Sequence, residues 1–175
     1  ECFIGIDDCF PVTGSSVKSK LTSIPDCQSI IKKAIVEKLK ESYRIDWFKE
    51  TGALYRIEFF ISHDIATIMI DTSGAPLHKR GYRPDSNAAP LRETLAAAMV
   101  KIARPRTDVL LWDPFCGSGT IAIEAAMLMT NTAPGLNRTF AAQQFDFLDD
   151  NIWKRAKEEA KDKIIQNCEF YAFAS

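Results

Sequence analysis

The stretch Asp108-Val109-Leu110-Leu111-Trp112-Asp113-Pro114-Phe115-Cys116-Gly117-Ser118-Gly119-Thr120 decides the fold of the second half of this 175-residue chain. Residues 108–112 are short and mostly apolar and predict a buried parallel strand, while residues 120–129 predict a helix. Between them, Gly117 and Gly119 permit positive φ and a close approach of the backbone to a ligand. The order of strand, glycine turn and helix predicts an α/β domain with a ligand at the carboxyl end of the strand.

The composition of the turn narrows the class of ligand. No lysine follows the last glycine, as a P-loop requires, and position 122 is Ala where a dinucleotide-binding turn has its third glycine. Asp113 at the strand end would repel a pyrophosphate and suits a ligand that has an ammonium group and no phosphate. S-adenosylmethionine (SAM) fits that description. The structural alternative is a turn that only reverses the chain, with Asp113 capping it.

The flanking sequence continues the α/β pattern. Pro90 suits the first position of a helix, and one face of that helix is marked by Leu91, Leu95, Ala98, Met99 and Ile102. Residues 149–165 predict a charged helix, and residues 169–174 predict another strand. Residues 77–84 are basic and lack periodicity, so we interpret this stretch as a linker.

The first seventy residues have a different pattern. A helical stripe is formed by Cys27, Ile30, Ile31, Ala34, Ile35 and Leu39. Residues 54–61 then alternate between polar and apolar, residues 62–64 suit a turn, and residues 65–71 predict a second strand. This order predicts an α+β module.

Composition excludes several classes of protein. Hydrophobic residues make up 46% and charged residues 26% of the chain, as in a soluble globular protein, and no apolar run reaches the ~18 residues that span a bilayer. The five cysteines are odd in number and contain no C-x-x-C pair, which favours reduced thiols in the cytoplasm over disulfides or a zinc site. The start lacks both Met and a signal-peptide pattern, so we expect a preceding segment.

The net charge of −1 does not indicate a nucleic-acid partner, but local charge does. Between Lys18 and Lys49 the sequence has eight Lys or Arg against four Asp or Glu. This excess suits contact with phosphates. A solvated helix face is the alternative.

Several segments resemble one enzyme family. Residues 113–120 resemble motif I of the amino-methyltransferases, and residues 90–96 resemble the preceding motif, whose helix start helps to hold the methionine end of SAM. Residues 133–138 (Ala-Pro-Gly-Leu-Asn-Arg) and 77–83 resemble segments of the THUMP-containing RNA guanine-N2 methyltransferases, which include a ribosomal RNA large-subunit enzyme. The first ~70 residues resemble the carboxyl-terminal part of a THUMP domain, an RNA-binding module.

The resemblance implies an α/β fold in which the first half of a Rossmann-like, SAM-dependent methyltransferase domain follows a partial α+β THUMP domain. The implied boundaries are 1–72 for THUMP, 73–86 for a basic linker and 87–175 for the methyltransferase part. The implied reaction moves a methyl group from SAM to the N2 amine of a guanine in ribosomal RNA or tRNA, without a metal or a membrane. The implied cofactor-binding residues are Pro90, Leu91, Arg92, Glu93, Asp113, Phe115, Cys116, Gly117, Ser118, Gly119 and Thr120.

The same resemblance suggests where RNA binds. Lys18 and Lys20 are candidates for phosphate contacts, with plain solvation as the alternative. Lys79, Arg80 and Arg83 are candidates for RNA binding at the domain junction, and pairing with acidic neighbours is the alternative for these three.

The chain contains no catalytic residue that the resemblance would assign. The family's N/D-P-P-Y/F motif, which holds the target amine and stacks the base, does not occur in this sequence. The expected acidic residue after the strand 169–174 also has no position before Ser175, so we expect the transfer site and half of the cofactor pocket beyond it. Two alternatives stay open, a DNA adenine-N6 or cytosine-N4 methyltransferase and a non-enzymatic RNA-binding module.

Overall fold

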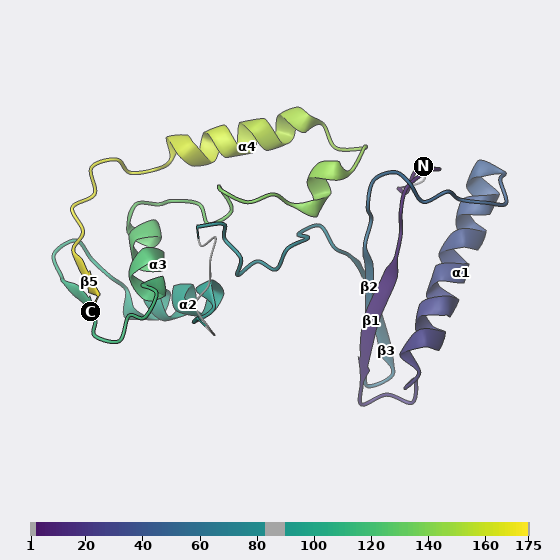
Figure 1. The fold of residues 1–175 in the computed structure, drawn as a ribbon, viewed down its shortest axis with the longest axis horizontal. Helices are drawn as coiled ribbons and strands as arrows, with labels where there is room; N and C mark the ends of the chain where they lie inside the picture. The colour runs from purple at the N-terminus through teal and green to yellow at the C-terminus, as the bar shows by residue number, and fades with distance from the viewer. Residues whose placement is uncertain (1–2, 83–89, 175) are drawn as a thin grey trace. The chain divides into compact units, whose positions relative to one another are not determined.

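The structure, a computed structural model, describes residues 3–82 and 90–174, and it divides the chain into two compact units. Unit 1 comprises Glu1–Gly74 and Phe140–Asp149, and unit 2 comprises Ala75–Thr139 and Asp150–Ser175. Each unit has its own sheet (Figure 1). In the described part of the chain, no helix combines the length and the apolar composition that crossing a membrane requires.

Unit 1 is built on a three-stranded sheet in the order β1-β2-β3. Strand β1 (Val12–Val17) pairs in parallel with β2 (Ile57–Ser62), which pairs antiparallel with β3 (Ile65–Ile70). Helix α1 (Ile24–Tyr43) connects β1 to β2 and lies along the sheet (Figure 1). The predicted helix and the two later strands are confirmed. Strand β1 was not predicted, because Thr13, Gly14, Ser15 and Ser16 give it no apolar alternation.

The core of unit 1 lies between α1 and the sheet. Cys27 of α1 packs with Phe59 and Ile61 of β2, and the partly buried residues around them are Val12, Ile24 and Ile31. The predicted stripe of α1 is wider than the face that the sheet covers. Cys27 and Leu39 are buried, whereas Ile30 is 68% exposed.

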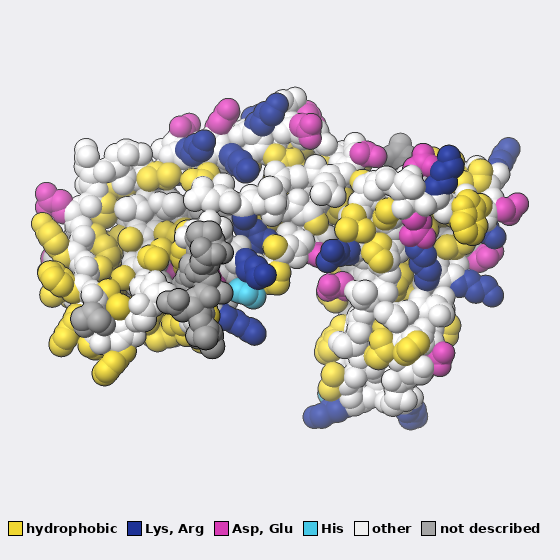
Figure 2. Space-filling model, viewed as in Figure 1, with side chains coloured by type: hydrophobic (Ala, Val, Ile, Leu, Met, Phe, Trp, Pro, Cys, Tyr) yellow, Lys and Arg dark blue, Asp and Glu magenta, His cyan; other side chains and the backbone are white. Residues whose placement is uncertain are grey.

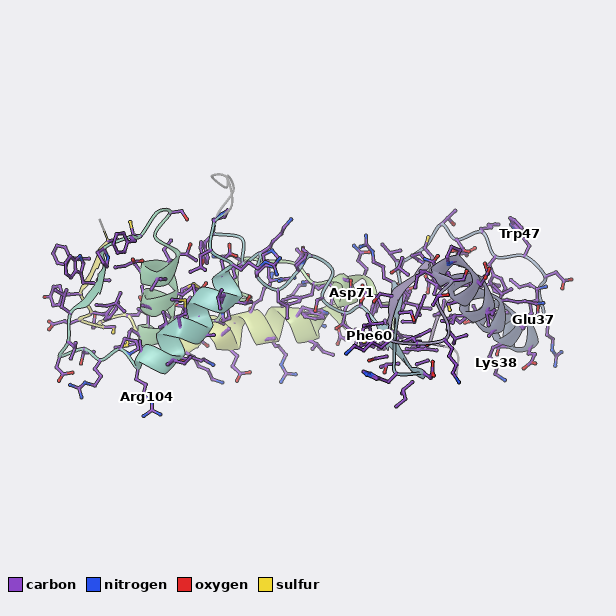
Figure 3. All side chains as sticks on the ribbon, turned by 90° about the horizontal axis from the view of Figure 1, so that it is seen from below. Glu37, Lys38, Trp47, Phe60, Asp71 and Arg104 are labelled. Carbon is purple, nitrogen blue, oxygen red and sulfur yellow. The ribbon has the colours of Figure 1, made fainter. Side chains whose placement is uncertain are left out.

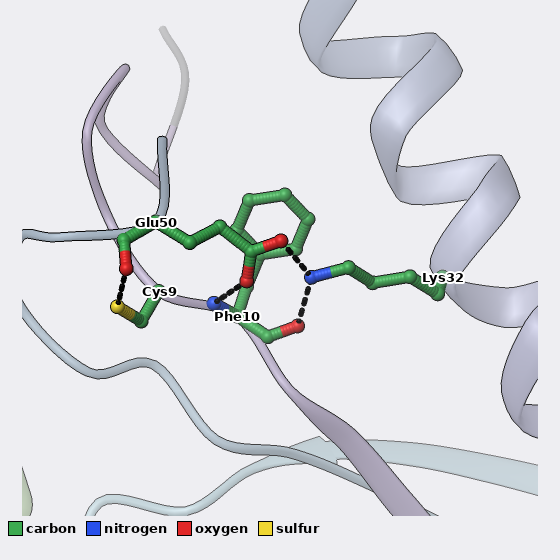
Figure 4. A network of polar contacts seen from close by, with 4 residues as sticks. All are labelled: Cys9, Phe10, Lys32 and Glu50. Atoms are coloured by element: carbon green, nitrogen blue, oxygen red, sulfur yellow. Dashed lines mark hydrogen bonds and ion pairs between the residues drawn. The ribbon is translucent and has the colours of Figure 1, made fainter. Parts of the chain in front are cut away.

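A polar network fastens the middle of α1 to the chain on either side of it (Figure 4). The ammonium of Lys32 donates to Glu50 Oε1 at 2.7 Å and to the carbonyl of Phe10 at 3.0 Å, and it lies 3.5 Å from the centre of the Phe10 ring. The backbone carbonyl of Glu50 also accepts the Cys9 thiol at 2.6 Å. Lys32 is therefore a structural residue within the basic stretch.

Unit 2 has helices α2 (Glu93–Ala103), α3 (Thr120–Met129) and α4 (Asp150–Asp162). Its sheet pairs β4 (Leu111–Asp113) in parallel with β5 (Ala172–Ala174). The predicted parallel strand is thus present, but it is shorter and begins later than residues 108–112. The prediction that it is buried is wrong, since Trp112 is 67% exposed: among the described residues β5 is its one partner strand.

Helix α2 packs against α3, but not with the face that its sequence marks. Ala96 and Val100 are buried, whereas Leu95, Met99 and Ile102 are 52%, 45% and 82% exposed. Small side chains let two helices approach closely, so the contact selects the alanine-rich face. The larger apolar side chains face outward in this structure.

Residues 140–149 lie between α3 and α4 in the sequence but fold as part of unit 1. The short 3-10 helix η1 (Ala141–Gln144) leads to Phe145, which is 2% exposed and stacks on the Tyr55 ring at a centroid distance of 4.3 Å. Burial raises the pKa of the Tyr55 phenol, and the nearby Asp8 raises it further. Ten residues between two helices of unit 2 therefore complete the core of unit 1.

Candidate cofactor-binding site

The predicted cofactor loop lies where β4 ends and α3 begins. Asp113 ends β4 and is 9% exposed, and its Oδ1 accepts a hydrogen bond from the Phe115 N–H at 3.1 Å. The N–H of Gly119 donates to the Cys116 carbonyl at 2.8 Å, which closes the turn. Asp113 therefore caps the turn, as the structural alternative required, and still presents a carboxylate at the carboxyl end of a parallel strand.

Both glycines of the loop adopt the left-handed conformation that glycine tolerates best. Gly117 has φ +53° and Gly119, the N-cap of α3, has φ +72°. A Cβ added at either position would have no heavy atom within 4 Å, apart from those of the glycine itself and of the residues directly before and after it. The space beside the loop is therefore open. The glycines are required here by their backbone angles and leave room for a ligand to approach the backbone.

The remaining loop residues separate into buried and exposed ones. Thr120 is 2% exposed, and its hydroxyl lies 3.3 Å from the Ser118 hydroxyl, which links the loop to the first turn of α3. Phe115 is 93% exposed, and Cys116 is half-buried with only a long contact, 3.7 Å, to the Gly117 carbonyl. Helix α3 begins directly after the loop, so the positive end of its dipole lies at the loop's carboxyl-terminal end.

The second predicted cofactor segment precedes α2. Pro90 and Leu91 are half-buried, and exposed Arg92 is the N-cap of α2, where its carbonyl accepts from the Leu95 and Ala96 N–H groups at 3.0 Å. Glu93 is 8% exposed in the first turn. A buried carboxylate at a helix amino terminus is stabilised by the helix dipole. The start of α2 therefore carries a buried acidic group, in the same unit as the glycine loop.

Helix α3 carries a buried carboxylate that the sequence motifs did not indicate. Glu124 is 5% exposed; its Oε1 accepts the Tyr82 hydroxyl at 2.8 Å and lies 2.9 Å from Arg80 Nε. The Arg80 N–H is not aligned for a hydrogen bond, so this contact is an ion pair. Glu124 is the one charged residue in the sequence of α3, which was the signal that could have identified it.

Arg138, at the end of the Ala133–Arg138 motif, is a second buried charge. It is 8% exposed, and its guanidinium donates to the backbone carbonyls of Ala75, Pro76 and Lys79. The predicted linker is therefore held by an arginine sixty residues away in the sequence. One arginine fork suits several carbonyls at once, which a lysine could not reproduce.

The candidate RNA-binding residues of unit 1 lie in the loop after β1. Lys18 and Lys20 are exposed, and basic side chains mark this end of the unit (Figure 2). Asp64 Oδ1 accepts from the Ser19 hydroxyl and from the Lys20 N–H, both at 2.7 Å. These two hydrogen bonds, that from the Lys20 N–H first, lower the pKa of Asp64. The loop that carries the lysines is therefore fixed to the turn between β2 and β3.

The other three candidates belong to the linker. Lys79 is exposed, and Arg83 lies outside the described residues. Arg80 has the alternative role considered for it, since its side chain is 10% exposed and its guanidinium pairs with Glu124. Lys79 is therefore accessible to a phosphate, whereas most of the Arg80 side chain is buried beside Glu124.

Family models match both parts of the chain. Residues 80–174 match the family described as "RMKL-like, methyltransferase domain", and residues 1–71 match the THUMP domain. These matches confirm the predicted resemblance and fold class. The predicted linker boundaries at 73 and 86 stay predictions.

Two of the curated relatives illustrate the similarity along the whole chain. "Putative RNA methyltransferase YpsC" of Bacillus subtilis (strain 168) is 49% identical over 175 residues, which are 99% of this chain and 46% of that protein. "Ribosomal RNA large subunit methyltransferase K/L" of Psychromonas ingrahamii is 35% identical over 180 residues, which are 100% of this chain and 24% of that protein. The chain thus spans about half, or less, of the length of these relatives.

Solved structures share the fold of nearly the whole chain. A "predicted N6-adenine-specific DNA methylase" from Listeria monocytogenes has a TM-score of 0.90 at 46% identity, covering 97% of this chain and 46% of that one. "SMU.472, a putative methyltransferase complexed with SAH" has a TM-score of 0.89 at 39% identity, covering 97% and 45%. With its second half matched by the family model and its first by THUMP, this chain belongs to the family of RMKL-like methyltransferase domains.

Proposed function

We propose that the protein containing this chain is a SAM-dependent RNA methyltransferase that methylates the exocyclic N2 amine of a guanine. Ribosomal RNA is the proposed substrate, with tRNA as the alternative. The observation that supports this proposal best is the loop at the carboxyl end of β4. It joins a buried aspartate, two glycines at positive φ and the amino terminus of α3.

The residues of the loop suit SAM. Asp113 offers a carboxylate to a cationic, phosphate-free ligand, and open space beside Gly117 and Gly119 admits it close to the backbone. Residues 90–93 are proposed to hold the methionine end at the start of α2. One solved relative is named as a complex with SAH, the molecule that SAM becomes after losing its methyl group.

SAM supplies an activated methyl group, so the protein's contribution is to bind and orient. When bound, SAM would supply its methyl group to the guanine amine and leave as SAH, and the amine proton would pass to solvent. The groups proposed here bind and orient the cofactor. No residue of this chain is assigned to the target base.

RNA is favoured as the substrate by the match of residues 1–71 to THUMP and by the names of the two curated relatives. Lys18 and Lys20, on their fixed loop in unit 1, are proposed to contact the phosphate backbone, and Lys79 of unit 2 is proposed to do the same. DNA is the competing substrate, because the Listeria protein is named as a DNA methylase.

The test uses the full-length protein with labelled SAM and three substrates, namely unmodified ribosomal RNA, tRNA and duplex DNA, followed by nucleoside analysis. N2-methylguanosine in RNA is expected. N6-methyladenine found only in DNA would replace this proposal by the DNA methyltransferase. RNA binding without cofactor binding would favour a non-enzymatic module.

A further inference from the structure

A tryptophan projects from unit 1, although the residue directly after it belongs to the core. Trp47 is 79% exposed and projects from the unit (Figure 3), whereas Phe48 is 8% exposed. The Phe48 ring meets the Phe10 ring edge to face, at a centroid distance of 6.1 Å. Tryptophan is highly buried on average, so an indole held in solvent is unusual. Trp47 therefore offers most of its aromatic surface to a ligand.

The loop that carries Trp47 is fixed on both sides of the indole. Before it, Arg44 ends α1 in the left-handed conformation, and its N–H donates to the Lys40 carbonyl at 2.8 Å. After it, the Glu50 carboxylate pairs with the Lys32 ammonium of α1 at 2.7 Å (Figure 4). A ligand that binds to Trp47 therefore needs little further ordering of the backbone, which favours affinity.

The charges around Trp47 leave two cations without a described partner. The carboxylates between positions 41 and 50 each lie close to a lysine, in the pairs Glu41–Lys38 at 3.0 Å, Asp46–Lys40 at 4.0 Å and Glu50–Lys32 at 2.7 Å. Arg44 and Lys49 are exposed, and among the described residues neither side chain has an ion pair or a hydrogen bond. Their Cα atoms lie within roughly 11 Å and 7 Å of the Trp47 Cα, because each residue extends the chain by at most about 3.6 Å.

We infer that Trp47, Arg44 and Lys49 form a binding site for an unpaired nucleotide of RNA. The base stacks on the indole, and the two cations contact the phosphates on either side of it. This inference rests on the proposed function and deepens it, because it selects single-stranded segments of the RNA. Every base has a flat face that can stack on an aromatic ring, so the site does not require a particular base.

A single-stranded segment suits this site better than a duplex or a protein surface. In a duplex the bases are stacked on one another, and their faces cannot reach an indole. A protein partner would bury a contiguous apolar patch. The residues that flank Trp47 are instead the exposed, charged Asp46 and the buried Phe48. Lys18 and Lys20 lie in another loop and offer only charge, so they suit the phosphates of either form of RNA.

The experiment titrates the full-length protein with a single-stranded RNA and with a fully paired duplex of the same length. The difference in fluorescence between the parent and Trp47→Phe isolates the signal of this indole, which the single strand should quench. Trp47→Ala should weaken binding of the single strand by roughly 5- to 100-fold, with less than a twofold effect on the duplex. Trp47→Phe should retain most of the affinity. Phe60→Leu, which removes another exposed ring of unit 1, is the matched control and should change neither affinity.

The two cations have their own measurement. Arg44→Met and Lys49→Met should each reduce the slope of log K against log salt by about 0.7 for the single strand, because one phosphate contact is lost in each variant. Unchanged slopes would remove both cations from the site. Lys18→Met should weaken binding of both RNA forms alike, which separates a charge contact from a stacking contact.

Equal losses on both RNA forms in Trp47→Ala, or no loss on either, would overturn the inference. A blue-shifted Trp47 signal that RNA does not quench would also overturn it, because another part of the full-length chain would then cover the indole. Failure of the proposed function is seen separately, since the titration needs neither SAM nor catalysis. RNA that quenches Trp47 in a protein that methylates only DNA would support this site and reject the proposed reaction.

Discussion

The ion pair between Arg80 and Glu124 gives the sharpest test of how unit 2 is stabilised. Glu124→Gln keeps the shape of the side chain and removes its charge. The two side chains are 10% and 4% exposed, so the Arg80 guanidinium would stay buried without its partner. Breaking one side of a buried pair costs about 3–5 kcal/mol, because an uncompensated charge is left behind.

The matched control removes both charges. Arg80→Met with Glu124→Leu and Tyr82→Phe replaces the polar cluster by apolar groups of similar size, and its stability should lie within about 1 kcal/mol of the parent. The assay is amide hydrogen exchange of the full-length protein, followed by mass spectrometry of α3 peptides, which reports the opening free energy of that helix.

Two results would refute this reasoning. A change below about 1 kcal/mol for Glu124→Gln would mean that Arg80 finds water or another partner at little cost. A triple variant as unstable as the single one would show that packing rather than charge determines the loss. A large loss in the single variant with recovery in the triple is the expected outcome.

Three further predictions concern other parts of the chain. Gly119→Ala, at φ +72°, should destabilise the start of α3 by about 1–2 kcal/mol and weaken SAM binding in calorimetry; unchanged affinity would separate the loop from the cofactor. Phe145→Ala removes a ring that is 2% exposed and should destabilise unit 1 by about 3–5 kcal/mol, seen as faster hydrogen exchange in β2, with α3 unchanged. The Asp64 carboxyl should titrate below 3.8 in NMR, because the Lys20 N–H and then the Ser19 hydroxyl stabilise its charged form. Because the pKa of Asp64 is lower in the folded state than in the unfolded state, its charged form stabilises the fold. This stabilisation is complete at a pH above the pKa of the unfolded state and is lost as the pH falls through the pKa of the folded state. An NMR pKa at or above 3.8 would contradict the prediction.

Exposed aromatic and apolar side chains show the limits of periodicity. Trp47 is 79% exposed and projects from unit 1 (Figure 3), and Phe60 is 41% exposed. The sequence predicts an apolar stripe on each of the helices α1 and α2. In α1 only part of the predicted stripe is buried, and in α2 none of the residues of the predicted stripe is buried. An apolar stripe indicates which faces of a helix can be buried. The topology of the chain determines which other element packs against the helix, and therefore which face is buried.

The sequence by itself determined the class of the fold and the position of the glycine loop that is proposed to bind the cofactor. Strand, glycine turn and helix are local events, set by apolar runs, by the missing Cβ of Gly117 and Gly119 and by the helix start at Thr120. For the same reason, the helix that carries the stripe from Cys27 to Leu39 and the strands at 54–61 and 65–71 could be predicted from neighbouring residues alone. The structure has these elements at 24–43, 57–62 and 65–70.

Only the tertiary structure decided which charges serve the fold. Arg80 and Arg138 are ordinary basic residues in the sequence, yet one is paired with Glu124 and the other holds three carbonyls of the linker. The return of residues 140–149 to unit 1 was likewise not readable from local pattern, because Phe145 and Tyr55 are ninety residues apart. Long-range contacts depend on burial, and burial is a property of the assembled chain rather than of any short stretch of it.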